Sequence, residues 1–106
     1  MERTERIKRI IFDVVDELNL GLPQENQLEK STNTVLSGKS GKLDSLGLVN
    51  LIVTTEQKIE EEFGVKISIS DERAVLKKNS PFKTVRTLIK YIALLLDEKI
   101  NGSTEN

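Results

Sequence analysis

Apolar residues recur at helical spacing in three separate stretches of the chain. In the first stretch, charged side chains separate apolar positions that fall on one helical face: Ile7, Ile10, Ile11, Val14 and Leu18. This arrangement is typical of a helix with one buried face. Thr4 is a suitable N-cap, and Gly21 and Pro23 follow as a suitable stop. The pattern therefore predicts a helix over residues 5–20.

A second amphipathic helix is predicted over residues 45–63, with Gly64 suited to the position after its last turn. Its apolar stripe advances in steps of three or four residues, through Leu48, Ile52, Thr55, Ile59 and Phe63. Leu46 and Val53 lie to one side of this stripe, on a flank that also holds Asn50, Gln57 and Glu60. Two apolar side chains on a polar flank suggest a docking surface, although single exposed apolar residues are also ordinary.

A third helix is predicted to begin near Pro81 or Thr84 and to end at Asn101-Gly102. Its broad apolar face comprises Val85, Leu88, Ile89, Ile92, Leu95 and Leu96. Residues 65–69 alternate like a strand, but no other segment is suited to pair with them, so we expect an extended connector. Residues 70–76 have the pattern of a short capped helix.

The connection between the first two helices, residues 21–44, is long and rich in Ser, Thr, Asn, Gly and Lys. Its scattered apolar residues predict a loop that packs across the bundle, with residues 38–41 as its most mobile part. The predicted fold is all-α: a small helical bundle of three longer helices and one short helix, with a long loop between the first and second helices. The 106 residues form a single domain, with a core over about residues 4–100 and a frayed tail at 101–106.

Composition excludes several classes of function. The formal net charge of −1 argues against a general nucleic-acid binder. The chain has no Cys and no His, so it lacks a thiolate nucleophile, a thiolate metal site and the usual general base near neutral pH. The charged N-terminus has no apolar signal region, and the longest apolar run, residues 91–96, is too short to span a bilayer. We therefore expect a cytoplasmic protein without membrane insertion.

Charge is unevenly distributed along the chain. Residues 44–64 carry five acids and one base, a net charge of −4, whereas residues 65–106 carry eight bases and five acids, a net charge of +3. The two parts could present faces of opposite sign, which bears on the choice of partner.

The stretch Asp44-Ser45-Leu46-Gly47 opens the second helix and allows two interpretations of Ser45. Asp44 or Ser45 could simply be the N-cap. However, a capping box would need Glu or Gln three residues further on, where the sequence has Gly47 or Leu48. Gly47 costs roughly 1 kcal/mol relative to Ala inside a helix, and a small residue there leaves the surroundings of the serine open. A serine at a helix N-terminus is also well placed to carry a phosphate, because free N–H groups and the helix dipole stabilise negative charge.

Catalysis by Ser45 itself is disfavoured. A catalytic serine needs an adjacent base and an oxyanion site, and this chain has no His and no Gly-x-Ser-x-Gly elbow around the residue. We therefore expect no enzymatic activity. Another enzyme would supply the base and the metal needed to transfer a phosphate group to Ser45.

Three segments, LDSLGLVNLI, EEEFGVKIS and FKTVRTLIKYI, resemble in sequence and order the acyl carrier proteins that depend on phosphopantetheine. The similarity covers essentially the whole chain. It implies that Ser45 bears 4′-phosphopantetheine through a phosphodiester, installed from coenzyme A by a phosphopantetheinyl transferase. Asp44 and Leu46 complete the motif around this serine. Acyl groups would be carried as thioesters on the terminal thiol of the arm, between partner enzymes.

The resemblance also implies that the second helix is the surface recognised by partner enzymes, which would be acyl- or aminoacyl-loading ligases or synthases. Leu46 and Val53 fall where apolar contacts of this kind are expected. The other expected partner-binding residues are Asn50, Glu56, Glu60 and Glu61. Each exposed ion pair made by these acids would contribute only about 0–1 kcal/mol and would weaken with salt. We further expect a monomer.

Two features depart from the common fatty-acid carriers. Gly47 and Asn50 stand where those proteins have acids, and Phe63 lies about one helical turn farther from the serine. Both favour a specialised, free-standing carrier of a lipid or secondary-metabolite pathway. Two alternatives stay open: an aminoacyl or peptidyl carrier loaded by an adenylating ligase, and an unmodified helical interaction module in which Ser45 is only a cap.

Overall fold

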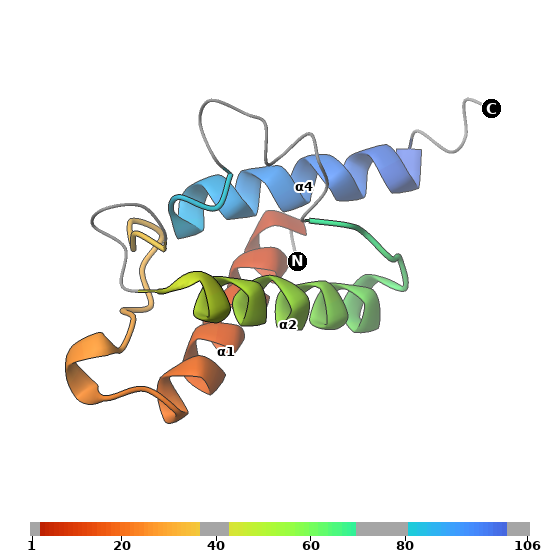
Figure 1. Cartoon of the computed structure of the whole chain (residues 1–106). Helices are drawn as coiled ribbons and strands as arrows, with labels where there is room; N and C mark the ends of the chain where they lie inside the picture. Colours follow the sequence, from red (N-terminus) through yellow and green to blue (C-terminus); the bar gives the residue numbers. More distant parts are fainter. Residues whose placement is uncertain (1–2, 37–42, 70–80, 102–106) are drawn as a thin grey trace.

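The computed structural model describes residues 3–36, 43–69 and 81–101, and for Ser45 and Asn101 the backbone alone. These residues form three α-helices, α1 (Arg3–Leu20), α2 (Ser45–Phe63) and α4 (Val85–Asn101), and one 3₁₀ turn, η1 (Gln24–Asn26) (Figure 1). All three predicted long helices are confirmed, and the all-α fold with them. The predicted short helix over residues 70–76, the loop tip at 38–41 and the tail at 102–106 lie outside the described residues.

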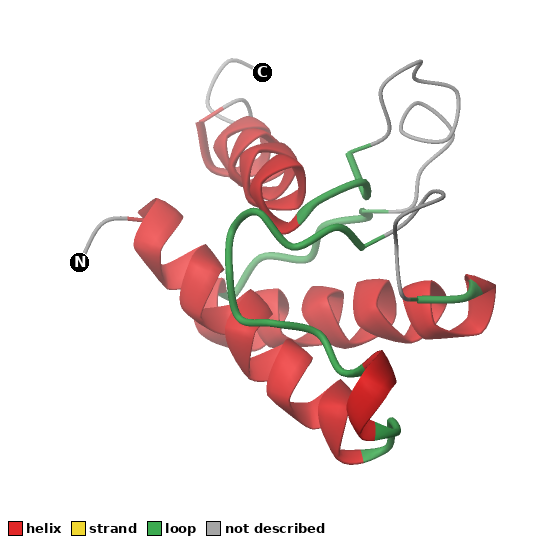
Figure 2. Ribbon diagram, turned by 90° about the vertical axis from the view of Figure 1, so that its left-hand side faces the viewer, coloured by secondary structure: helices red, strands yellow, loops and turns green. Residues whose placement is uncertain are grey.

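Helix α1 is the element that joins the bundle, because it contacts both α2 and α4. In Figure 1 α4 lies above α2, and Figure 2 shows α1 crossing α2, with α2 seen lengthwise and α4 nearly end-on. The fully buried side chains of α1 are Ile7, Ile11, Val14 and Val15. α1 begins at Arg3, two residues before the predicted start, so Thr4 lies inside the helix and its prediction as the N-cap was wrong. The side chain of Arg3 lies 3.7 Å from Asp97 of α4.

The apolar stripe predicted on α2 faces the core. Ile52, Thr55 and Ile59 are buried, and Leu48 and Phe63 at its ends are partly buried. Leu51 is also fully buried, although it is not part of the predicted stripe. The buried face of α2 is therefore wider than one stripe.

The first loop packs across the bundle, as predicted. The Asn19 side chain brackets residue 28, since its Nδ2 donates to the Leu28 carbonyl at 2.9 Å and its Oδ1 accepts from the Leu28 amide at 2.8 Å. Leu28 and Leu36 are both buried. The loop therefore contributes two core residues, and η1 is a turn within it that the sequence pattern did not predict.

The same loop is tied to the start of α4 by backbone hydrogen bonds. The Leu36 amide donates to the Lys83 carbonyl at 2.7 Å, and the amides of Val85 and Arg86 donate to loop carbonyls at 3.0 and 2.9 Å. Val35 and Thr84 form an isolated antiparallel bridge. First-turn N–H groups of a helix have no acceptors within the helix, so the loop supplies acceptors that α4 needs. Figure 2 shows this loop rising from the end of α1 to the start of α4.

Thr84 and Thr87 cap α4 reciprocally. The Thr87 amide donates to Thr84 Oγ1 at 3.1 Å, and the Thr84 amide donates to Thr87 Oγ1 at 3.1 Å. This is the geometry of a capping box, with Thr in place of the usual Glu or Gln. The cap confirms Thr84 as the predicted start of the helix.

The connector after α2 is extended, as predicted. Gly64 adopts a left-handed conformation with φ of 67° and ends α2, where its amide donates to the Glu60 carbonyl at 2.8 Å. Residues 65–69 form no strand, and Ile67 and Ile69 are buried. The connector therefore fills part of the core rather than running free over the surface.

Two ion pairs join α1 to the second half of α2. Arg6 Nη2 lies 2.7 Å from Glu62 Oε2, and the Arg6 guanidinium lies over the ring of Phe63, 4.4 Å from its centroid. Lys58 Nζ lies 2.8 Å from Glu17 Oε2, and this hydrogen bond raises the pKa of Lys58 above its ordinary value of 10.5. Solvent screens exposed pairs of this kind, so they help to orient the two helices more than they stabilise them.

We expect Thr84→Ala to lower the free energy of unfolding by about 1 kcal/mol, because it removes the cap of α4. Urea unfolding followed by circular dichroism measures the change. Thr4→Ala is the matched control, since Thr4 is an exposed threonine inside α1. We expect a change within about 0.5 kcal/mol there. Equal effects of the two substitutions would contradict the assigned cap.

Thr55→Val should raise the free energy of unfolding by about 1 kcal/mol. Thr55 is fully buried, and within the described part of the chain its Oγ1 has no hydrogen-bond partner. Valine keeps the shape and removes the unsatisfied hydroxyl. Thr54→Val, at the partly exposed neighbour, serves as the control and should change stability little. Destabilisation by Thr55→Val would mean that the hydroxyl is satisfied in solution.

Candidate functional site

The candidate site is the N-terminal turn of α2. Asp44 has an extended backbone conformation, and its Oδ1 accepts a hydrogen bond from the Gly47 amide at 2.7 Å. The Leu48 amide donates to the Asp44 carbonyl at 2.9 Å, which is the first bond of the helix. Asp44 is therefore the N-cap, and Ser45 is the first helical residue. The side chain of Ser45 lies outside the described part of the structure.

Gly47 has a local packing role in this turn. A Cβ atom at residue 47 would lie 3.1 Å from Leu43 Cδ2 and 3.2 Å from Asp44 Oδ1, the oxygen that accepts the cap bond. A larger residue would therefore press on the cap and on Leu43, which packs against the core. The space beside Gly47 is taken up by these two side chains, rather than left open as the sequence interpretation had it.

The electrostatics of this turn suit a negatively charged group. Ser45 opens a helix of 19 residues, and the first turn after the cap contains no acidic residue. The N-terminal end of a helix carries positive partial charge and N–H groups without helical acceptors, which stabilise a phosphate. A serine hydroxyl here is chemically able to carry a phosphodiester. Leu46 and Gly47 are uncharged, whereas the neighbouring Asp44 carboxylate is a negative charge that already accepts a hydrogen bond from the Gly47 amide.

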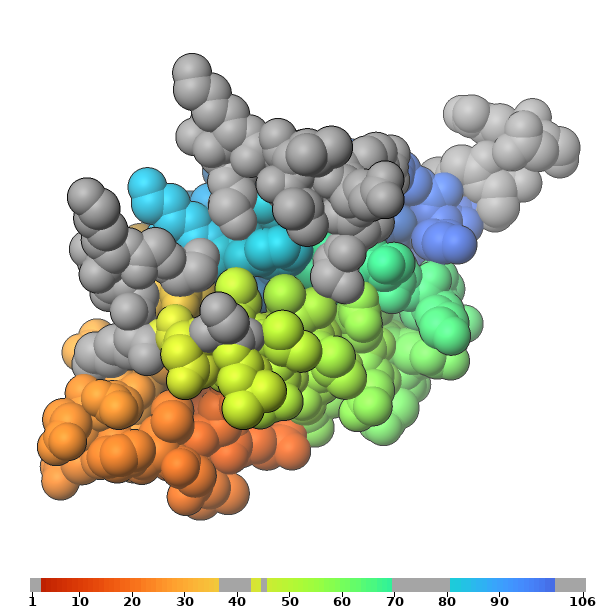
Figure 3. Space-filling model, viewed as in Figure 1, coloured from red at the N-terminus to blue at the C-terminus, as the bar shows by residue number. Residues whose placement is uncertain are grey.

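Next to Ser45, α2 exposes a row of apolar side chains. Leu46, Val49 and Val53 are 70%, 52% and 45% exposed, and we call these three residues the apolar row. They lie on successive turns of one side of α2, and Figure 3 shows this helix at the molecular surface (yellow-green to green). Leu46 and Val53 are exposed where the sequence predicted. Val49 was missed, although its spacing of three from Leu46 and four from Val53 carried the signal.

The predicted polar contacts of α2 have different surroundings. Asn50 is exposed between the apolar residues, and Glu60 and Glu61 are exposed near the far end of the helix. Glu56 is partly buried, and its Oε2 accepts a hydrogen bond from the Ile69 amide at 2.6 Å. Glu56 thus holds the connector in place, a role that the sequence did not predict. Partner binding by these four residues stays a prediction.

No family model matches this chain, and comparison with curated proteins and with solved structures finds no match. Within the described residues, none of the helices is both long and apolar enough to cross a membrane. The assignment of a function therefore depends on the site itself.

Removing the Asp44 cap should destabilise the helix that presents the site. We expect Asp44→Ala to lower the free energy of unfolding by about 1 kcal/mol and Asp44→Asn to change it by less than half as much, because Asn caps helices as well as Asp does. Chemical denaturation measures both changes. Asn50→Ala, at an exposed position six residues further along the helix, is the control and should stay within about 0.5 kcal/mol. If Asp44→Ala left the free energy of unfolding unchanged, the assignment of Asp44 as the cap would be contradicted.

Proposed function

We propose that this chain is a free-standing acyl carrier protein, with a 4′-phosphopantetheine arm on Ser45. It would catalyse no reaction itself. It would receive its arm from coenzyme A through a phosphopantetheinyl transferase and carry acyl intermediates between the enzymes of a specialised lipid or secondary-metabolite pathway. A cytoplasmic, monomeric protein fits this role.

The observation that carries the proposal is the separation of roles between residues 44 and 45. The Asp44 carboxylate accepts the cap bond from the Gly47 amide. Asp44 is therefore the N-cap, whereas Ser45 is the first helical residue. This weakens the alternative of an unmodified helical module in which Ser45 is only a cap, and it favours the proposal of a chemical role for the serine.

The residues of the chain fit the proposed cofactor. The Ser45 hydroxyl would hold the phosphodiester, and the N-terminal end of α2 would stabilise its negative charge. When bound, the arm supplies a thiol for thioester formation, a group that this cysteine-free chain does not have. Asp44 keeps Ser45 at the first helical position and would lie beside the serine when the transferase binds.

The apolar row supports a docking surface for partner enzymes. Leu46 is adjacent to Ser45, and Val53 lies eight residues on, about 12 Å along the helix axis. An enzyme that covers the row would therefore lie beside the serine and its arm. Glu60 and Glu61, about two turns beyond Val53, would add charge at the far end of the same helix. The first two turns of α2 present apolar side chains rather than charged ones, which fits a partner enzyme dedicated to this carrier.

Incubation with coenzyme A and a phosphopantetheinyl transferase should add one arm to the wild-type protein, as measured by intact-protein mass spectrometry. Ser45→Ala should gain none. Its stability should stay within about 0.5 kcal/mol of wild type, because Asp44 still caps the helix. Ser68→Ala, at an exposed serine of the connector, is the control and should be modified like wild type. An unmodified wild-type protein with several competent transferases, or a modified Ser45→Ala, would contradict the proposal.

A further inference from the structure

Most cations of the first two helices are matched by an acid. Ion pairs within the described residues engage Arg3, Arg6, Lys8, Lys30 and Lys58. α4 differs in this respect. Lys83 just before the helix, and Arg86 and Lys90 in its first two turns, are all exposed and form no ion pair with any described residue. Glu29, on the loop that contacts this end of α4, is not paired with Arg86.

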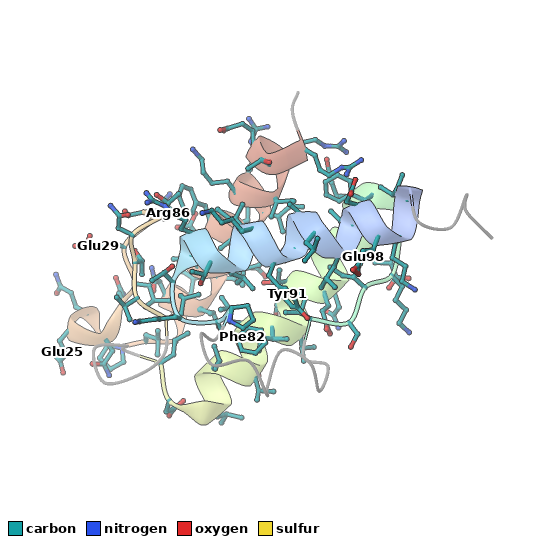
Figure 4. The ribbon with its side chains drawn as sticks, turned by 90° about the horizontal axis from the view of Figure 1, so that it is seen from above. Glu25, Glu29, Phe82, Arg86, Tyr91 and Glu98 are labelled. Atoms are coloured by element: carbon teal, nitrogen blue, oxygen red, sulfur yellow. The ribbon has the colours of Figure 1, made fainter. Side chains whose placement is uncertain are left out.

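Two of these cations lie on one side of α4, and the third lies just before the helix. Arg86 and Lys90 are about one turn apart, and Leu94, one turn further on, is 50% exposed. Lys83 precedes the Thr84 cap and lies outside the helix. We call these four residues the basic row. Its helical part, from Arg86 to Leu94, extends about 12 Å. Figure 4 looks down on α4 and shows Arg86 and Glu98 toward opposite ends of the helix.

The cations of the basic row do not lie where they would stabilise α4. Lys83 and Arg86 flank the N-terminal end of α4, where the helix dipole is positive and cations are unfavourable. The first turn of α4 contains no acidic residue to compensate. Arg86 is held in this position by the bond from its amide to the Thr32 carbonyl at 2.9 Å, and its Nη2 lies 3.4 Å from Thr32 Oγ1.

We propose that the basic row binds an acidic, helical segment of a partner protein, with Leu94 as an apolar anchor. Charge complementarity defines this partner: acids at spacings of three and four would face the three cations, followed by one apolar side chain. The opposite face of α4 is buried in the core, including Leu88, Ile92 and Leu96, so the helix has no apolar face left to insert into a lipid surface. The overall charge of −1 disfavours nucleic acid.

This surface is separate from the apolar row of α2 and opposite in character to the acidic end of that helix. The inference therefore goes beyond the carrier function and does not depend on Ser45. It would let the protein bind one partner through α2 and an acidic partner through α4, at the same time or in turn.

The probe for the experiment is a synthetic helical peptide with four Glu at spacings of three and four and one Leu, compared with its Glu-to-Gln counterpart. Amide chemical shifts in heteronuclear NMR locate the peptide, and the titration gives its affinity. The triple variant Lys83→Gln, Arg86→Gln, Lys90→Gln removes the row. Its control is Arg9→Gln, Lys66→Gln, Lys99→Gln, which removes three other exposed, unpaired cations and changes the net charge equally.

We expect the Glu peptide to shift α4 amides, and the triple variant to weaken binding at least tenfold while the control weakens it less than twofold. Lys83→Gln with Lys90→Gln, which keeps the contact between Arg86 and Thr32, should give an intermediate loss. The midpoint of thermal unfolding should not fall in the triple variant. The proposal would be overturned if both triple variants weakened binding equally or if the Gln peptide bound as well as the Glu peptide. It would also be overturned by chemical-shift changes outside α4 or by self-association through the row.

Discussion

The hydrogen bond from the Gly47 amide to the Asp44 carboxylate is the interaction on which the candidate site depends. It fixes the residue at which α2 begins and satisfies a first-turn N–H group that has no acceptor within the helix. Burial of the stripe through Ile52 and Ile59 sets the rotation of the helix, and the apolar row then faces solvent. A start one residue later would leave the serine outside the helix, away from its positive end.

The rest of the molecule supports that helix from two sides. α1 contributes the buried residues that α2 and α4 share, and ion pairs such as the one between Arg6 and Glu62 set its contact with the second half of α2. The first loop is anchored by Leu28 and Leu36 in the core and by its backbone bonds to the start of α4. The segment that leads to Asp44 thus leaves from a fixed point, and the Glu56 carboxylate fixes the connector on the other side of α2.

The helices could be predicted from the preferences of single residues and from helical spacing. Features that depend on contacts between residues distant in the sequence could not be predicted in this way. Asp44 before α2 and Gly64 after it mark the ends of that helix by the preferences of single residues. The burial of Leu51 depends on how α2 packs in the bundle, which helical spacing alone does not contain. The bond between Glu56 and the Ile69 amide likewise joins residues thirteen apart in the sequence and has no local signal. The exposure of Val49 was within reach, since its spacing matches the two apolar neighbours that were identified.

We propose that Ser45 is a point of covalent attachment at the start of a capped helix. Peptide mapping by mass spectrometry, on protein isolated from the cells that naturally produce it, would show the arm and its location together. We expect phosphopantetheine, free or acylated, on the peptide that contains Ser45. An unmodified Ser45 in all of the isolated protein, or an arm on another residue, would contradict it.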